Sequence, residues 1–547
     1  MTQSQKSDKV IKDKTQKAKL VYGLISCAII TFALLYALRG DNIKITQYND
    51  LNSPVEIRPD YSGTVIPPNI APLNFVVQHD GSGYFVRISS ETGNPIEIFS
   101  KTPKIVIPKK AWHNLLEQNR GRQLNLDIFV KSKTSATNTE TVNQQWTRYR
   151  TITNEIANEN IDSFLVYRKI RPGHRLWRNI GIYQRNLASF EESLILNNEY
   201  FKHGCLNCHT FCLNKTDKML IGIRSSVYGS STLLIEDGEV KKIGTKFGYS
   251  TWHPSGRIAS FSVNDVRLML HSATYEVRDV MDFDSLMANY FTDSKTVKTT
   301  SVLTKSDRLE TYPTWSPDGR YLYFCSAPIT WTDRTLVPDD YYQIKYDLVR
   351  ADYDIDRDQW GTLEILLKAK DTGLSILLPR ISPDGRWLLF CMCNYGCFPV
   401  YQASSDLYMA DLKETEQTGQ FEYRKLDINS DQSESWHSFS SNSRWIAFSS
   451  KRNSGIFTRT YLAYLNEDGT ASKPVLLPQK DPTHYDTCLW TYSVPELITE
   501  PVRVTKEQLG KVVRASQKIP IEMPITMATP KAGVHLLHDE QWQTERE

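Results

Sequence analysis

Hydrophobic positions follow two patterns along the chain, one long uncharged run near the start and many short alternating stretches after it. Residues 20–38 carry no charged side chain, and nineteen residues at about 1.5 Å rise each can cross a bilayer core of roughly 30 Å. Farther along, apolar and polar side chains alternate over stretches of four to seven residues, which is the period of a half-buried strand. The pattern predicts one transmembrane helix followed by a mostly β chain.

The residues before the uncharged run predict its orientation. A cluster of lysines on this side keeps the N-terminus in the cytoplasm. We therefore expect a single-pass inner-membrane protein with its bulk in the periplasm. A cleaved signal peptide, or a lipoprotein signal ending at Cys27, is the alternative, but the apolar run continues eleven residues beyond Cys27. The lysines are Lys6, Lys9, Lys12, Lys14, Lys17 and Lys19.

Short alternating stretches separated by Gly, Asn and Pro occupy residues 45–150. About 100 residues of short strands with frequent turns predict an immunoglobulin-like β-sandwich, with one helical turn at residues 112–116. Residues 151–204 are expected to connect this domain to the next unit through a strand at 164–169 and a helix-like stretch at 182–196. The alternating stretches are 75–78, 84–88, 95–99, 104–107 and 124–130.

A repeat occupies the second half of the chain. Four segments align without gaps, and their arginines Arg257, Arg320, Arg386 and Arg444 are 63, 66 and 58 residues apart. Each unit reads as a strand, a Ser-Pro-Asp-Gly-like turn and a second strand ending in Phe, followed by further extended stretches. Four strands per unit at this period predict the blades of a β-propeller. The segments are 251–261, 314–324, 380–390 and 438–448.

The turn sequence W-S-P-D-G-[RK]-x-[IL]-x-F resembles the WD40-like repeat of TolB-type β-propeller proteins. The match is closest at residues 315–324 and looser where His253 and Ser441 replace repeat residues. The resemblance covers roughly residues 205–490 and implies six blades. Four are plain in the sequence and a fifth begins near Phe211, while a sixth would have to come from residues after about 479.

The pentapeptide C-L-N-C-H at residues 205–209 is the attachment sequence for c-type haem. The thiols of Cys205 and Cys208 can add to the two vinyl groups of one haem, and His209 can bind the iron as its proximal ligand. A small disulfide, a redox pair and half of a zinc site are the alternatives, but the sequence offers no second Cys/His pair at the spacing that would complete a zinc site. The motif predicts one covalent haem c in an exported chain.

Two further residues are candidates for the distal iron ligand. Met219 lies ten residues after His209, within reach of the far face of a porphyrin, although a methionine between Lys218 and Leu220 is also an ordinary core residue. His253 replaces the serine of the repeat turn in the next blade, where the alternative is a solvated turn histidine. We expect the haem either at the mouth of the propeller channel or on a linker outside it.

Composition narrows the functional classes. Lys and Arg (65) nearly balance Asp and Glu (62), so nucleic-acid binding has no electrostatic support. Cys391, Cys393 and Cys397 fit strand-borne thiols, one local disulfide or a metal site. Without a hydrolase or phosphate-binding motif, we expect an electron carrier or binding protein rather than a classical enzyme. A periplasmic or membrane redox partner is expected, or an envelope protein that docks on the propeller while the haem is structural or sensory.

The expected organisation follows from these patterns. The units are a basic cytoplasmic segment (1–19), the transmembrane helix (20–38), the β-sandwich (45–150), the connecting segment (151–204), the haem motif with the propeller (205–490) and a C-terminal tail (491–547).

Overall fold

A computed structural model describes residues 45–133, 145–171, 179–271, 276–333 and 336–521. The prediction of a mostly β chain is confirmed, because strands dominate these residues and helices are short. No helix in the described ranges is long and apolar enough to cross a membrane. The predicted transmembrane helix and its lysine cluster lie outside the described residues.

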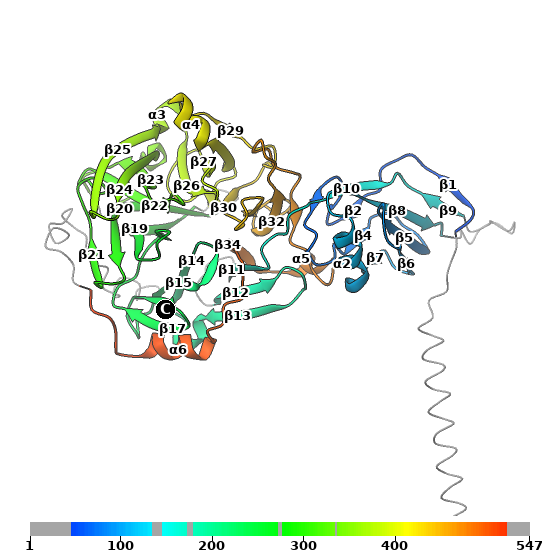
Figure 1. The fold of residues 1–547 in the computed structure, drawn as a ribbon, viewed down its shortest axis with the longest axis horizontal. Helices are drawn as coiled ribbons and strands as arrows, with labels where there is room; N and C mark the ends of the chain where they lie inside the picture. The colour runs from blue at the N-terminus through cyan, green and yellow to red at the C-terminus, as the bar shows by residue number, and fades with distance from the viewer. Residues whose placement is uncertain (1–44, 134–144, 172–178, 272–275, 334–335, 522–547) are drawn as a thin grey trace, which may run out of the picture.

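The N-terminal unit contains two sheets that share one hydrophobic core (Figure 1). The unit is mostly β, as expected, and its core extends into neighbouring propeller sheets. The parallel pairs β1–β9 and β10–β3 differ from the purely antiparallel sheets of an immunoglobulin domain. The larger sheet contains β1 (Tyr48–Asp50), β9 (Trp146–Arg148), β8 (Gln123–Lys131), β10 (Ile152–Ile156), β3 (Val65–Ile66), β5 (Gly83–Ser89) and β6 (Ile96–Ser100); the smaller contains β2 (Ile57–Arg58), β4 (Phe75–Val77) and β7 (Lys104–Ile105).

Six four-stranded sheets form the larger part of the described chain. From inner to outer strand they are β34 (Thr491–Ile498), β11 (Phe164–Ile170), β12 (Ile180–Asn186), β13 (Glu192–Asn197); β14 (Cys205–Cys212), β15 (Lys215–Arg224), β16 (Ser231–Glu236), β17 (Glu239–Ile243); β18 (Ser250–Trp252), β19 (Ile258–Leu270), β20 (Arg278–Phe291), β21 (Thr296–Lys298); β22 (Arg308–Trp315), β23 (Tyr321–Pro328), β24 (Asp347–Asp354), β25 (Gln359–Leu367); β26 (Ser375–Ile381), β27 (Trp387–Cys393), β28 (Asp406–Asp411), β29 (Tyr423–Lys425); and β30 (Glu434–Phe439), β31 (Trp445–Ser450), β32 (Arg459–Tyr464), β33 (Val475–Leu476).

The short helices lie between or beside these strands. Helix α2 covers the N-terminal core with Trp112, in agreement with the predicted helical turn. Helix α6 begins at the capping box of Thr505 and packs against β13 and β17 (Figure 1). The helices are α2 (Lys109–Gln118), α3 (Ala369–Thr372), α4 (Leu412–Thr418), α5 (His484–Thr487) and α6 (Lys506–Arg514), with 3₁₀ turns η1 (Asn198–Phe201), η2 (Tyr341–Gln343) and η3 (Pro399–Tyr401).

The six inner strands contact one another in a closed ring, which is the geometry of a β-propeller. The ring closes through the sheet in which β34, near the C-terminus, pairs with β11 from the first half of the propeller chain (Figure 1). The structure therefore differs from the expected organisation. Residues 151–204 contribute three propeller strands, and residues 182–196 lie in β12 and β13 instead of a helix. The predicted tail supplies the fourth strand of this sheet.

The repeat turn explains how each inner strand passes to the next strand. In the turn of residues 316–319, Asp318 Oδ1 accepts hydrogen bonds from the Ser316 hydroxyl (2.5 Å) and the Arg320 backbone N–H (3.0 Å). Gly319 follows at φ 74°, which favours glycine. Trp315 is buried and its indole donates to Ser260 Oγ of the preceding blade (2.9 Å). The motif thus fixes both the hairpin and its packing against a neighbouring blade.

Candidate functional site

The pentapeptide of residues 205–209 lies in β14, the inner strand of its sheet, and not on an external linker. Four other inner strands, β22, β26, β30 and β34, each contain a β-bulge near the middle, where the pairing register shifts. The bulged residue has a positive φ in each of them: Tyr312, Leu378, Trp436 and Val494. Cys208 occupies the equivalent position in β14, because the pairing shifts between Asn207 and His209. The second thiol of the motif is therefore the bulged residue of a channel-lining strand.

The bulge determines which way the motif residues face. Strand alternation puts Leu206 and Cys205 on opposite faces, and the extra residue Cys208 returns His209 to the face of Leu206. Leu206 packs in the core shared with the sheet of β34 and β11. On this same side, the Nε2 atom of His209 lies 3.8 Å from a carboxylate oxygen of Glu496 in β34. His209 therefore faces one neighbouring blade while Cys205 faces the other.

The two thiols share one charged neighbour. Burial and the positive charge of Arg224 lower the pKa of Lys246 to about 7, while Cys205 and Cys208 act in the opposite direction. Lys246 lies four residues before β18, and Cys208 also acts on the pKa of Arg380 in β26, so the second thiol has charged neighbours from two other sheets. As a strand, the segment does not present the two thiols and the imidazole to one porphyrin. The residue types fit covalent haem, but their arrangement in the strand β14 does not. For a haem to be attached, residues 205–208 would have to adopt a backbone conformation other than this strand.

His209 has the environment of a metal-ligating histidine that lacks a partner. Its side chain is fully buried, and neither ring nitrogen makes a hydrogen bond of normal geometry with a described residue, although the Val494 backbone is close enough to act on its pKa. Burial, together with the positive charge of Arg168, lowers its pKa to about 3, so the imidazole is neutral at pH 7. A neutral imidazole keeps one lone pair available for a metal ion. Buried nitrogens without a partner are costly and call for an explanation.

Met219 lies in the hydrophobic core. The residue is fully buried in β15, paired with Phe211 and Ile235 of the adjacent strands, and belongs to the core between two blades. Met219 is therefore a core residue of its strand, the alternative to a ligand role, and it does not line the cavity that His209 lines.

Two substitutions separate a core role of Met219 from a ligand role. Met219→Ala should reduce the free energy of unfolding by about 2–5 kcal/mol, whereas Met219→Leu, which nearly conserves volume, should cost less than about 1.5 kcal/mol. Urea denaturation measures both. A thioether ligand would instead be lost in both variants, so a changed haem spectrum in Met219→Leu would contradict the core role.

His253 is not a solvated turn residue. It is buried, its Nδ1 lies 2.8 Å from Ser255 Oγ, and its Nε2 lies 3.2 Å from the Gly319 carbonyl oxygen. Its ring packs edge-on against Trp315 at 4.7 Å between centroids, and burial lowers its pKa. The histidine thus joins the turns of two blades. Both nitrogens already have partners, unlike those of His209.

A cavity of about 370 Å³ lies at the end of the channel where the repeat turns gather. It brings together side chains that sequence reasoning did not select, Arg380 from β26 and Glu496 from β34. Burial raises the pKa of Glu496 to about 7, although the Phe211 backbone N–H donates to its carboxylate at 3.0 Å. The sequence did contain a signal for Arg380. The aligned repeats carry Thr251, Thr314 and Ser438 at this position, so an arginine departs from the repeat.

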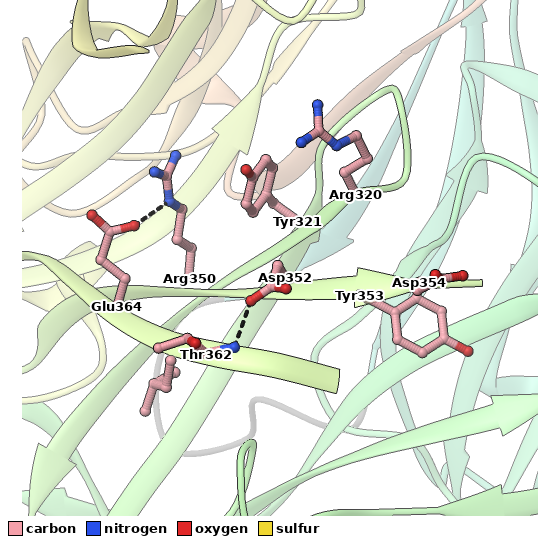
Figure 2. A pocket seen from close by; sticks show the side chains of 9 residues that line it. Arg320, Tyr321, Arg350, Asp352, Tyr353, Asp354, Thr362 and Glu364 are labelled. Carbon is pink, nitrogen blue, oxygen red and sulfur yellow. Dashed lines mark hydrogen bonds and ion pairs between the residues drawn. The ribbon is translucent and has the colours of Figure 1, made fainter. Parts of the chain in front are cut away.

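A second hollow of about 480 Å³ lies on the sheet of β22–β25 (Figure 2). Its polar side chains already bind one another. Arg350 donates to Glu364 at 2.7 Å, and Asp352 accepts the Thr362 backbone N–H at 2.6 Å. The hollow is lined on one side by Arg320 and Tyr321. None of its lining residues belongs to the haem motif.

The other cysteines have structural environments. Cys391, Cys393 and Cys397 are buried free thiols, which favours strand-borne cysteines over a local disulfide. Burial raises the pKa of Cys393 to about 12. No group of three or more His, Cys, Asp or Glu side chains in the described ranges is arranged to hold a metal ion.

Six four-stranded sheets around one channel place the protein in the β-propeller class. No protein-family model matches the chain, and no curated protein matches it. Among solved structures it is similar to TolB from Acinetobacter baumannii, at 12% identity over 69% of this chain and 79% of that chain with a TM-score of 0.39. A hypothetical selenium-binding protein from Sulfolobus tokodaii matches at 9% identity over 80% and 99%, with a TM-score of 0.37. The propeller assignment rests on the sheet topology.

Proposed function

We propose that the protein is a membrane-anchored, periplasmic c-type cytochrome that passes electrons through one covalently bound haem. The observation that carries the proposal is the C-x-x-C-H pentapeptide of residues 205–209. With residues 205–208 on another backbone path than that of β14, Cys205 and Cys208 would hold the haem through thioether bonds, and His209 would be the proximal iron ligand. A haem bound there supplies reversible one-electron chemistry.

The surroundings of His209 support its role as a ligand. Its ring is neutral and buried, and its nitrogens make no hydrogen bond of normal geometry in the described part of the chain. Glu496 lies 3.8 Å from Nε2, which is too far for a hydrogen bond. The support for a ligand role therefore comes from the burial and neutrality of the ring.

The propeller gives this site a platform for a partner. Propellers present the loops and turns between strands at the two ends of the channel, and the haem motif belongs to an inner strand. We propose that a periplasmic or membrane redox protein docks over this channel. The uncharged run of residues 20–38 would tether the protein to the inner membrane.

An optical redox titration of the full chain in detergent tests the proposal. We expect a low-spin spectrum, reversible one-electron reduction and no binding of CO by the reduced protein. CO or NO binding would show an open iron site and would point to a sensor or an enzyme. A haem that resists reversible reduction would contradict electron transfer and favour an interaction scaffold with a structural haem.

A further inference from the structure

The cavity at the turn end of the channel has the features of a small-molecule site. Aromatic side chains form its walls, and prolines of successive repeat turns border it. Trp436 also lines it, and the Trp436 ring lies 6.1 Å between centroids from Tyr312, one of the rings packed across the channel. The wall and border residues used here are Trp252, Trp315, Phe439, Pro254, Pro317 and Pro383.

Arg380 and the exposed Lys215 are the cations that line this cavity, and the Arg380 guanidinium has donors to spare. Its Nη1 donates to the carbonyl oxygens of Pro313 (3.3 Å) and Pro379 (3.4 Å). The remaining guanidinium N–H groups have no hydrogen-bond partner, and no carboxylate lies within ion-pair distance, among the described residues. Burial lowers its pKa, although the charge of Glu496 acts against that. A guanidinium that is partly removed from solvent and still has N–H groups without a partner is suited to bind a carboxylate through two hydrogen bonds.

The position of Arg380 argues against a purely structural role. The residues aligned with Arg380 in three other blades are Thr251, Thr314 and Ser438. A blade of this propeller therefore packs with a small hydroxyl side chain at this position and does not need an arginine there. An arginine here adds the cost of partial desolvation without forming an ion pair. Departures from a repeat that bring such a cost are expected at functional positions.

We propose that this cavity binds a small organic carboxylate with a flat apolar body. The carboxylate would accept hydrogen bonds from Arg380, and the body would pack against Trp252 and Trp315. The volume of about 370 Å³ corresponds to roughly twelve water molecules and lies within the usual range for ligand pockets. His209 also lines this cavity, so the binding test includes a chain that carries no covalent haem.

Calorimetric titration of the full chain in detergent tests the site, with phenylacetate as the probe and phenylacetamide as its neutral, nearly isosteric control. We expect saturable binding of phenylacetate and at least tenfold weaker binding of the amide. Arg380→Gln should weaken phenylacetate binding at least tenfold. Arg320→Gln, in the hollow of Figure 2, should leave it unchanged. Quenching of tryptophan fluorescence gives a second readout of the same binding.

Three outcomes would overturn the site: no saturable binding at millimolar phenylacetate, equal binding of the acid and the amide, or full binding by folded Arg380→Gln. Should that variant not fold, the acid–amide comparison on the unaltered chain decides. The Cys205→Ser, Cys208→Ser chain is titrated in parallel. It carries no covalent haem beside His209 and should bind phenylacetate at least as tightly as the unaltered chain, which keeps this result separate from the haem proposal.

Discussion

A chain with serine in place of both Cys205 and Cys208 is expected to lose covalent haem completely. Each thioether forms when a thiol adds across a vinyl group, and a serine hydroxyl does not make that bond under the same conditions. Both cysteines are partly exposed, so the smaller polar side chains should not prevent folding. Expressed with a c-type maturation system, the unaltered chain should give a haem-stained band on a denaturing gel, and the double variant a band at background.

Cys212→Ser is the matched control for this experiment. Cys212 ends the same strand, but it is buried and its thiol contacts the His253 carbonyl oxygen at 3.8 Å, a donor role that a hydroxyl can take. The haem stain should persist in this variant. A stained band from the double variant, or colour removed from the unaltered chain by acid–acetone, would show that the haem is not attached through the motif.

The fold could be predicted from sequence where its information is local. The repeat turn recurs because the residues at the positions of Asp318 and Gly319 close the same hairpin in each aligned blade, so the pattern identified strands, turns and blade spacing together. The closing sheet could not be predicted in this way. Its inner strand β34 pairs with β11 more than 300 residues earlier, and no local pattern encodes that pairing. Over residues 182–196 the hydrophobic pattern matches the period of a strand and the period of a helix about equally. The pattern therefore could not distinguish β12 and β13 from a helix.

The sequence predicted which residues belong to the candidate site, but it did not predict which face of the strand each side chain occupies. The pentapeptide identified Cys205, Cys208 and His209 because their order is itself the signal. The sequence did not show that Cys208 is a bulged residue, and one extra residue in a strand changes the face of every side chain after it. Spacing likewise could not place Met219, because a distance along the chain does not tell which face of β15 it occupies. Arg380 and Glu496 meet only once the ring has closed.

The closing strand is expected to determine the stability of the whole propeller. Leu497 of β34 is fully buried and belongs to the core that joins the N-terminal unit to the closing sheet. Leu497→Ala should lower the free energy of unfolding by about 2–5 kcal/mol, because it removes buried methyl groups and leaves a cavity. Leu489, eight residues earlier, is 57% exposed, and Leu489→Ala should change stability by less than about 0.5 kcal/mol.

A chain ending at residue 490 should show a still larger effect than the point substitution. Without β34, strand β11 loses its antiparallel partner and exposes an unpaired inner edge, and the ring of inner strands opens between β30 and β14. We expect such a chain to lose its cooperative thermal transition and to be cleaved rapidly by added protease, while the Leu489→Ala chain resists. A cooperative transition retained by the shortened chain would show that the other five sheets are stable without closure. The ring would then be held by contacts between neighbouring blades rather than by the pairing of β34 with β11.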